Sequence, residues 1–322
     1  MTKTLLIGPA GCGKTGLLLD AFERFLQSTP DPLASDGFFV VPSMEHTGRV
    51  VSLLAQRGVK GFFYRRVTTL SNLVGDLFRI PDVPVVSSLT RAMIVKDLLR
   101  NHRWEYFRGV QEQPGFLGLA LQFFTELKEA CLLPEEFRLR MNALKGFEPV
   151  YATKYEALAA LYEAYALELG KRGLRDNQDA LGIFRERKKK GGTALSHLKA
   201  LWIDGFFDFS NLQREYLGEL SGIADEITVT LPQEDGAGWE DAFEAVAGTR
   251  QSLVAMGFKV RKMKSHSYRT CKPALLSLQK DLFSGRKSAC TSEGITLFDA
   301  VGTDGEVELI AREIHRLYAA GS

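Results

Sequence analysis

The residues best suited to chemistry in this chain lie between positions 8 and 15, which match the pattern G-x-x-x-x-G-K-[ST]. An apolar run precedes them and a helical pattern follows, and in this strand–loop–helix order the pattern binds phosphate. Glycines let backbone N–H groups approach phosphate oxygens, and the helix start adds positive potential. We expect Lys14 to reach the β- and γ-phosphates of ATP and Thr15 to bind Mg²⁺. The expected nucleotide-binding residues are Gly8, Pro9, Ala10, Gly11, Cys12, Gly13, Lys14 and Thr15.

A second candidate site residue is Asp204, which ends the apolar run 201–204 and is the expected Mg²⁺ partner of Thr15. Motor ATPases usually place a glutamate directly after this aspartate to polarise the attacking water, whereas this chain has Gly205. Because loss of a general base costs on the order of 10²–10⁴ in rate, the sequence predicts nucleotide binding with weak hydrolysis. Asp208 is a weak candidate for the missing base, and a solvated loop acid is the competing interpretation.

Two basic segments are candidates for contact with DNA. Arg65 and Arg66 adjoin Phe63 and Tyr64, a mixture of charge and aromatic rings that is typical of nucleic-acid contacts at strand ends. Residues 185–192 form a basic run that could contact a phosphate backbone, and an exposed, solvated loop is the alternative. The candidates in this run are Arg187, Lys188 and Lys189.

Short apolar runs predict the strands that would position these residues. Such runs fit buried parallel strands, and together they indicate a doubly wound α/β sheet. The predicted strands are residues 4–7, 38–41, 64–69, 200–203 and 227–231. A further strand is expected at residues 294–300, followed by an amphipathic helix at 306–317.

Residues 86–195 carry helical periodicity and almost no strand signal, which predicts a helical insertion. Two apolar stripes with helical spacing mark the expected buried faces, and a third helix is expected to begin with Ser88 as its N-cap. The first stripe, on a helix expected to end at Pro134, is Phe116, Ala120, Phe124, Leu127 and Cys131. The second, on a helix expected to stop at Gly170, is Leu158, Leu161, Tyr162, Tyr165 and Leu169.

The composition is that of an ordinary globular protein, with 45% hydrophobic residues, 25% charged residues and a net charge of +2. A length of 322 residues exceeds what one core usually covers, so we expect two domains or one domain with a large insertion. The four cysteines are far apart, which indicates a reducing compartment and, with scattered histidines, no metal cluster. No signal peptide or membrane span is expected, and the predicted location is the cytoplasm.

The order of these motifs resembles the N-terminal part of the AddB (RexB) family, the second subunit of bacterial AddAB helicase–nucleases and a relative of UvrD-like helicases. The resemblance covers most of the chain. It rests on the loop at 8–15, on Phe-Val-Val-Pro at 39–42, on Arg-Val-Thr-Thr-Leu-Ser-Asn-Leu at 66–73 and on Asp-Gly-Phe at 204–206. UvrD-like motors carry Asp-Glu at the last of these positions.

The resemblance implies a P-loop NTPase (RecA-like) parallel sheet with a large helical insertion. Residues 1–85 and 196–292 would form domain 1A, residues 86–195 the helical domain 1B, and residues 293–322 the start of domain 2A. Thr69 and Ser71 would join the DNA contacts. The implied partners are DNA, single-stranded or as duplex ends, and an AddA-type helicase–nuclease subunit. The family's iron–sulfur cluster would lie beyond residue 322, so none is expected here.

The sequence therefore predicts an ATP- and Mg²⁺-binding, helicase-like N-terminal part of an AddB-type subunit that acts in DNA double-strand break processing and recombinational repair. One alternative is an active DNA-dependent ATPase or helicase, in which Asp208 positions water. A second is a P-loop kinase unrelated to DNA, with the helical insertion as a lid. A third is a structural interaction module whose loop binds no nucleotide.

Overall fold

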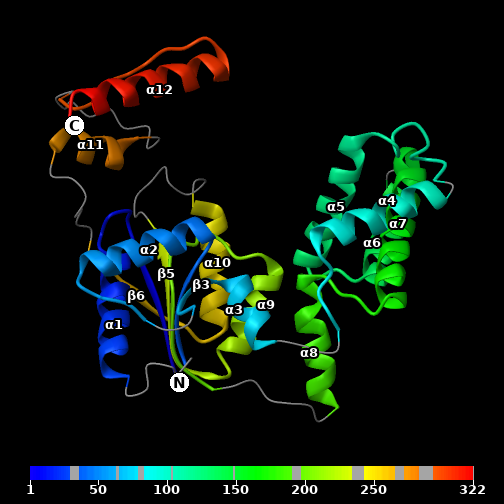
Figure 1. The fold of residues 1–322 in the computed structure, drawn as a ribbon, viewed down its shortest axis with the longest axis horizontal. Helices are drawn as coiled ribbons and strands as arrows, with labels where there is room; N and C mark the ends of the chain where they lie inside the picture. The colour runs from blue at the N-terminus through cyan, green and yellow to red at the C-terminus, as the bar shows by residue number, and fades with distance from the viewer. Residues whose placement is uncertain are drawn as a thin grey trace.

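The computed structural model describes residues 1–29, 36–62, 65–78, 83–102, 104–147, 149–190, 197–233, 243–264, 272–282 and 293–321. Within these residues six parallel strands form one sheet in the order β3-β2-β4-β5-β1-β6 (Figure 1). The strands are β1 (Thr2–Gly8), β2 (Gly37–Val41), β3 (Val67–Thr69), β4 (Leu198–Ile203), β5 (Ala224–Pro232) and β6 (Lys259–Lys262). This arrangement is a RecA-like α/β fold, and the predicted fold class is confirmed.

Both faces of the sheet are apolar. In β1, Leu5 and Ile7 join one hydrophobic cluster and Leu6 joins the other, because successive side chains of a strand point to opposite faces. Helices must therefore cover both sides of the sheet. The cluster of Leu6 is completed by α1 (Lys14–Ser28) and α2 (Met44–Gln56); the other is completed chiefly by α3 (Leu70–Leu77), α9 (Asn211–Leu220) and α10 (Glu244–Ala255).

A helical unit with its own core lies beside the sheet (Figure 1). It consists of α4 (Ser88–Asn101), α5 (Pro114–Glu129), α6 (Pro134–Phe147), a short 3-10 helix (Pro149–Tyr151) and α7 (Ala152–Lys171). The rings of Phe124 and Tyr165, one from each predicted stripe, stack with centroids 4.4 Å apart. The predicted helical stripes therefore do form a core.

Three details of the predicted helices are wrong, including the N-cap of α4, which was expected to be Ser88. Cys131 lies beyond the end of α5, is exposed and has a positive φ of 58°, so it is not on the buried face of that helix. Pro134 begins α6 instead of ending α5, since proline is well accommodated in the first turn of a helix. The N-cap of α4 is Ser87, whose hydroxyl accepts a hydrogen bond from the N–H of Thr90.

Helix α8 (Ala180–Lys189), which follows a 3-10 turn at Asn177–Asp179, contributes its buried residues to a core of the sheet. The ring of Phe184 lies 4.6 Å from that of Phe78, and both belong to the cluster on the α3 face of the sheet. The sequence predicts that the helical insertion extends to residue 195. We propose instead that it ends near residues 176–179.

The C-terminal part differs from its prediction. Residues 294–300 are not a strand; no strand in the described part of the chain pairs with them, and Leu297 is 94% exposed. The predicted helix at 306–317 lies within α12 (Gly302–Ala319), while α11 is Pro273–Asp281. Strand β6 was missed because its residues, Lys259–Lys262, are exposed and mostly basic, which gives no apolar run. Tyr64, at the start of the predicted third strand, lies outside the described residues.

Candidate phosphate-binding site

The loop after β1 has the backbone geometry that phosphate binding requires. Gly11 and Gly13 have positive φ values of 77° and 91°, which residues with a side chain rarely adopt. A Cβ atom at Gly8 would lie 2.9 Å from the sulfur of Cys12, so this position also needs glycine. No side chain caps α1 and no acid lies in its first turn. The N–H groups at the start of α1 are therefore available to an anion.

Lys14 opens α1 and folds back over the loop. Its ammonium donates hydrogen bonds to the carbonyl oxygens of Gly8 at 2.6 Å and Pro9 at 2.7 Å, and it lies 3.6 Å from the sulfur of Cys12. These carbonyls hold a lysine next to the loop without neutralising its charge. The ammonium is thus placed to exchange its carbonyl partners for phosphate oxygens, which are stronger acceptors.

Asp204 directly follows β4, and β5 lies between β4 and β1 in the sheet. Because the strands are parallel, the carboxyl ends of β1, β4 and β5 meet at one edge. Asp204 is 7% exposed, its N–H donates to the carbonyl of Val40 at 2.9 Å, and its Oδ1 accepts a hydrogen bond from the buried hydroxyl of Thr230 in β5. The sheet therefore fixes the carboxylate.

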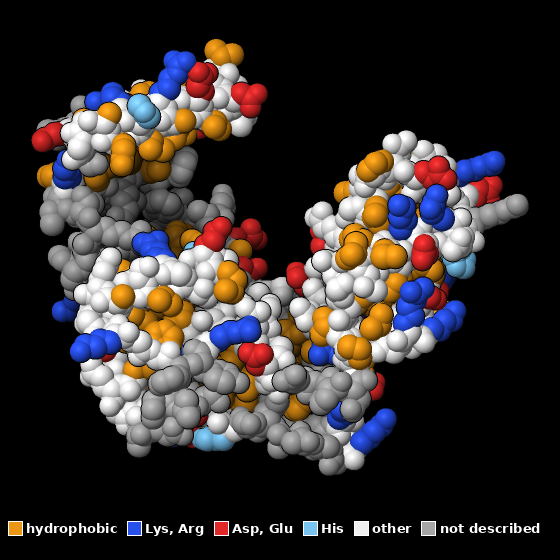
Figure 2. Space-filling model, in the orientation of Figure 1, with side chains coloured by type: hydrophobic (Ala, Val, Ile, Leu, Met, Phe, Trp, Pro, Cys, Tyr) orange, Lys and Arg blue, Asp and Glu red, His pale blue; other side chains and the backbone are white. Residues whose placement is uncertain are grey.

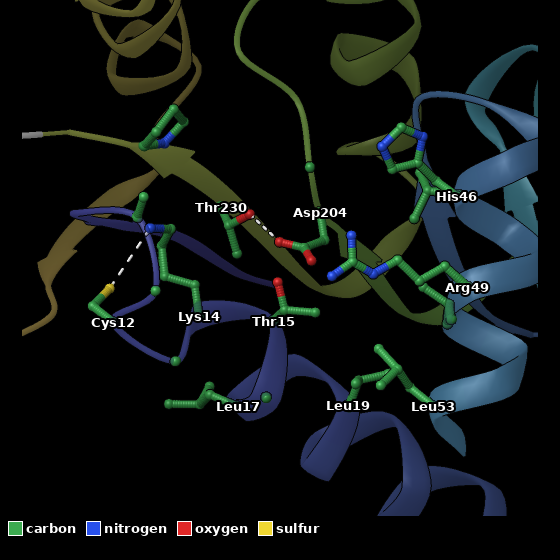
Figure 3. Close-up of a pocket in the computed structure, with 18 of the residues that line it drawn as sticks. Cys12, Lys14, Thr15, Leu17, Leu19, His46, Arg49, Leu53, Asp204 and Thr230 are labelled. Carbon is green, nitrogen blue, oxygen red and sulfur yellow. Dashed lines mark hydrogen bonds between the residues drawn. The ribbon is translucent and has the colours of Figure 1, made fainter. Parts of the chain in front are cut away.

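A pocket of about 840 Å³ joins the loop to this carboxylate. Figure 3 shows the side chains of Thr15 and Asp204 pointing toward one another across it. Mg²⁺ commonly keeps several waters and is held by one or two protein oxygens together with phosphates. A threonine hydroxyl and a carboxylate with one oxygen engaged by Thr230 fit that requirement.

Gly205 and Asp208 bear on whether the pocket could hydrolyse a nucleotide. Gly205 lines the pocket with a φ of 83°, so the backbone here is left-handed. Asp208 is not among the lining residues. Its Oδ1 accepts hydrogen bonds from the N–H of Phe209 at 2.7 Å, from Arg214 at 3.4 Å and from the hydroxyl of Thr249. These contacts hold the Asp208 carboxylate in place just before α9 and favour a structural role for it.

The structure corrects one predicted DNA contact near β3. Arg66 is 1% exposed, and its guanidinium carbon lies 5.8 Å from the centre of the Phe25 ring. A side chain buried under α1 does not reach a DNA backbone, so Arg66 is not a surface contact. Arg65 and Ser71 are exposed, while the Thr69 hydroxyl accepts a hydrogen bond from the N–H of Asn72 and caps α3.

The other predicted DNA contacts lie in α8 and not in a loop. Arg187 is half-buried and Lys189 is exposed, and the side chain of Lys188 lies outside the described residues. Arg185, earlier in the same helix, pairs with Glu219 and Glu215, each at 2.8 Å. The basic run is thus partly tied to α9, and the structure does not bring it to the pocket.

His46 and Arg49 of α2 are among the pocket-lining residues that sequence reasoning missed. Their position in the sequence could have indicated them. Helix α2 begins just after the carboxyl end of β2, which lies at the same edge of the sheet as the loop. The hydroxyl of Ser43 caps α2 and lies 2.8 Å from Nδ1 of His46. Figure 3 shows Arg49 extending from α2 toward Asp204 and Thr15.

The described residues show neither a membrane-spanning helix nor a cluster of metal ligands. None of the described helices combines the length and the apolar content that crossing a membrane requires. In the described part of the chain no group of three His, Cys, Asp or Glu side chains is placed to hold a metal ion. Cys271 and Cys290 lie outside that part.

The fold and the site define a class of protein: a RecA-like parallel sheet, interrupted by a helical unit, with a loop of the phosphate-binding pattern and an aspartate at one edge. The family described as "ADDB, N-terminal" matches residues 5–273, which is most of the chain. The chain belongs to this family.

Curated relatives are named as subunits of an ATP-dependent helicase/deoxyribonuclease. The protein from Desulforudis audaxviator (strain MP104C) is 26% identical over 339 residues, covering 98% of this chain and 28% of that protein. Those from Pelotomaculum thermopropionicum and Bacillus subtilis (strain 168) are 27% and 24% identical, each covering 98% of this chain and 29% of the relative. The chain thus spans less than a third of the length of these relatives.

Proposed function

We propose that this chain is the ATP-binding, helicase-like N-terminal part of an AddB-type subunit that processes DNA double-strand breaks for recombinational repair. The observation that carries the proposal is the single pocket that Lys14, Thr15 and Asp204 share. The family to which the chain belongs, and the name that its relatives carry, support a role within a helicase and deoxyribonuclease.

Different residues of the pocket would bind the phosphates and the Mg²⁺ ion of ATP. The N–H groups from Gly11 to Thr15 would hold the phosphates at the start of α1, and Lys14 would move from its carbonyl partners onto the β- and γ-phosphates. Thr15 and Asp204 would hold Mg²⁺, which neutralises part of the phosphate charge. Thr230 orients the Asp204 carboxylate for this purpose.

Hydrolysis would be weak for a structural reason. Activation of the attacking water needs a general base next to the γ-phosphate, and Gly205 supplies no side chain at that position. Asp208 is held by Phe209, Arg214 and Thr249 outside the pocket. ATP would therefore act as a bound ligand that stabilises the sheet, and translocation would fall to an AddA-type partner subunit in the cytoplasm.

Contact with DNA is the second part of the proposal. Arg65 and Ser71 are exposed, one before and one after β3 in the sequence, and Arg187, Lys188 and Lys189 are residues of α8. Because these contacts would be made to phosphates, binding of single-stranded DNA should weaken steeply as salt is raised. Failure to bind DNA at low salt would instead favour a P-loop kinase.

The proposal is tested by titrating the purified chain with a fluorescent ATP analogue, with and without Mg²⁺. We expect binding that Mg²⁺ strengthens and that Lys14→Ala abolishes. Lys171→Ala, which removes an exposed lysine of α7, is the matched control and should bind like the unmodified chain. Absence of binding by the unmodified chain would leave only a structural role for the loop.

A further inference from the structure

Arg49 is held at the mouth of the nucleotide pocket by the packing of α2. Thr47 and Val50, on either side of it in sequence, are 8% and 5% exposed and fix the inner face of the helix, while Ser43 caps its start. Arg49 itself is exposed yet lines the pocket. Its backbone is therefore anchored while its side chain remains available to a ligand.

The guanidinium of Arg49 reaches into the pocket from the side opposite Lys14 (Figure 3). Figure 3 shows it directed at the space between Thr15 and Asp204. Among the described residues, no acceptor forms a hydrogen bond or an ion pair with Arg49. Asp204 is held by Thr230 and not by this arginine. An unneutralised cation therefore faces the region expected to hold Mg²⁺ and the end of the phosphate chain.

Two other basic side chains that line the pocket, Lys14 and Arg57, already have protein partners. Lys14 donates to two carbonyls of the loop, and Arg57 pairs with Asp20 and lies 3.8 Å from Glu23. Lys14 lies at the loop, where it would also contact the β-phosphate that ADP and ATP share. Arg49 thus differs from Lys14 and Arg57 in two ways. It lies elsewhere in the pocket, and it has no protein partner among the described residues.

We propose that Arg49 is a specificity-determining residue of this site, whose guanidinium binds the terminal phosphate of the nucleotide and makes the site prefer ATP to ADP. The inference rests on the proposed binding of ATP. A guanidinium matches two phosphate oxygens at once, and such charge-assisted pairs are stronger than neutral hydrogen bonds. ADP has no phosphate in this part of the pocket, so it gains nothing from Arg49. Lys14 and the loop amides serve both nucleotides.

The test compares dissociation constants of matching fluorescent ATP and ADP analogues, in Mg²⁺, for the unmodified chain and for Arg49→Ala and Arg49→Lys. We expect Arg49→Ala to weaken ATP binding about 10-fold or more and ADP binding less than about 2-fold. Arg49→Lys keeps the positive charge but loses the planar guanidinium that binds two oxygens at once. Its dissociation constant for ATP should lie between those of the unmodified chain and Arg49→Ala. Arg24→Ala, an exposed arginine of α1 outside the pocket, is the control and should change neither constant.

Equal weakening of ATP and ADP in Arg49→Ala, or no change in either, would overturn the inference while leaving ATP binding intact. If the unmodified chain bound neither nucleotide, the proposed function would fail instead, so the two failures are distinguishable. Thermal unfolding midpoints of the variants would show whether they are folded. Arg49 makes no described hydrogen bond that the substitution could remove, so its midpoint should match that of the unmodified chain.

Discussion

Gly205 combines two properties that bear on catalysis. It stands where motor ATPases usually have the catalytic glutamate, and its φ of 83° lies in the left-handed region. A Cβ atom there would lie 3.4 Å from Cδ of Pro42, which is ordinary van der Waals contact, so the obstacle is the backbone conformation and not lack of space. The backbone, and not only the missing side chain, therefore opposes a carboxylate at this position.

Gly205→Glu should consequently fail to create an efficient ATPase. We expect a loss of about 1–2 kcal/mol in the free energy of unfolding, because a non-glycine residue is strained in this conformation. Gly205→Ala measures the backbone cost alone, by urea denaturation. A stable Gly205→Glu variant with turnover raised about 10²-fold or more would show that only the side chain was lacking.

Short sequence motifs predict which residues lie together only where those residues belong to, or directly follow, a strand of the sheet. Lys14, Thr15 and Asp204 were predicted from short patterns, and they meet in one pocket. Arg66 was assigned to the surface because a basic residue beside aromatics looks exposed, whereas α1 covers it. Arg49 was missed because its place depends on how α2 packs, which no short pattern reports.

A buried polar cluster joins the elements of the helical unit. Lys128 of α5, 8% exposed, lies 2.7 Å from carboxylate oxygens of Asp176 and Asp179. Asp176 is 3% exposed and also accepts hydrogen bonds from Tyr165 at 2.8 and 2.9 Å, while Arg91 of α4 lies 3.2 Å away. The cluster thus ties α4, α5 and α7 to the segment that leads into α8.

Lys128→Met should lower the free energy of unfolding by roughly 3 kcal/mol, because it leaves part of a buried carboxylate charge uncompensated. Arg138→Met is the matched control. Arg138 also pairs with two carboxylates, Glu156 and Glu163, but these groups are partly exposed, so we expect a loss of about 1 kcal/mol or less. Equal losses in urea denaturation would mean that burial does not distinguish the two clusters.

Burial of α9 against the sheet makes stability sensitive to alkaline pH. Burial raises the pKa of Tyr216 to about 12, against about 10 in the unfolded chain. Because the pKa is raised in the folded state, the contribution of Tyr216 to the free energy of unfolding is complete below pH 10. It is lost as pH rises toward 12. Relative to Tyr216→Phe, the unmodified chain should lose about 2–3 kcal/mol across that range. Parallel pH profiles of the two proteins would contradict this.

Apolar spacing predicted the helices α5 and α7, whereas α9, which buries Leu212, Tyr216, Leu217 and Leu220, was not predicted. The stripes of α5 and α7 became a core because their spacing leaves one face to bury. The exposed strand β6 was missed because it forms through backbone pairing with β1, which side chains do not report. Residues 294–300 show the converse case, since an apolar run without a neighbouring strand forms no sheet.

At the scale of the whole molecule, the sheet and the helical unit have separate cores. Figure 2 shows the helical unit separated from the C-terminal α12 by a wide hollow on this face. The described hydrogen bonds between unit and sheet include that from Asn211 of α9 to the carbonyl of Ala130, at 3.3 Å. Nucleotide bound at the sheet edge should therefore act first on the sheet.

Hydrogen exchange measured with and without ATP and Mg²⁺ should show this difference. Ligand at about 100 times its dissociation constant stabilises a domain by about 2.7 kcal/mol, so amides of α1, β1 and β4 should exchange more slowly. Amides of α4 and α7 should change little. The same slowing throughout the helical unit would mean that the two cores unfold together.

The pocket is expected to bind ATP and to turn it over poorly, and both properties are measured at once by following labelled ATP on the protein in the presence of single-stranded DNA. After an incubation of about an hour, recovered protein should carry intact ATP in the unmodified chain and none in Lys14→Ala, with little phosphate released. Rapid DNA-stimulated phosphate release, on the scale of about 1 s⁻¹ or faster that active enzymes reach, would contradict the account.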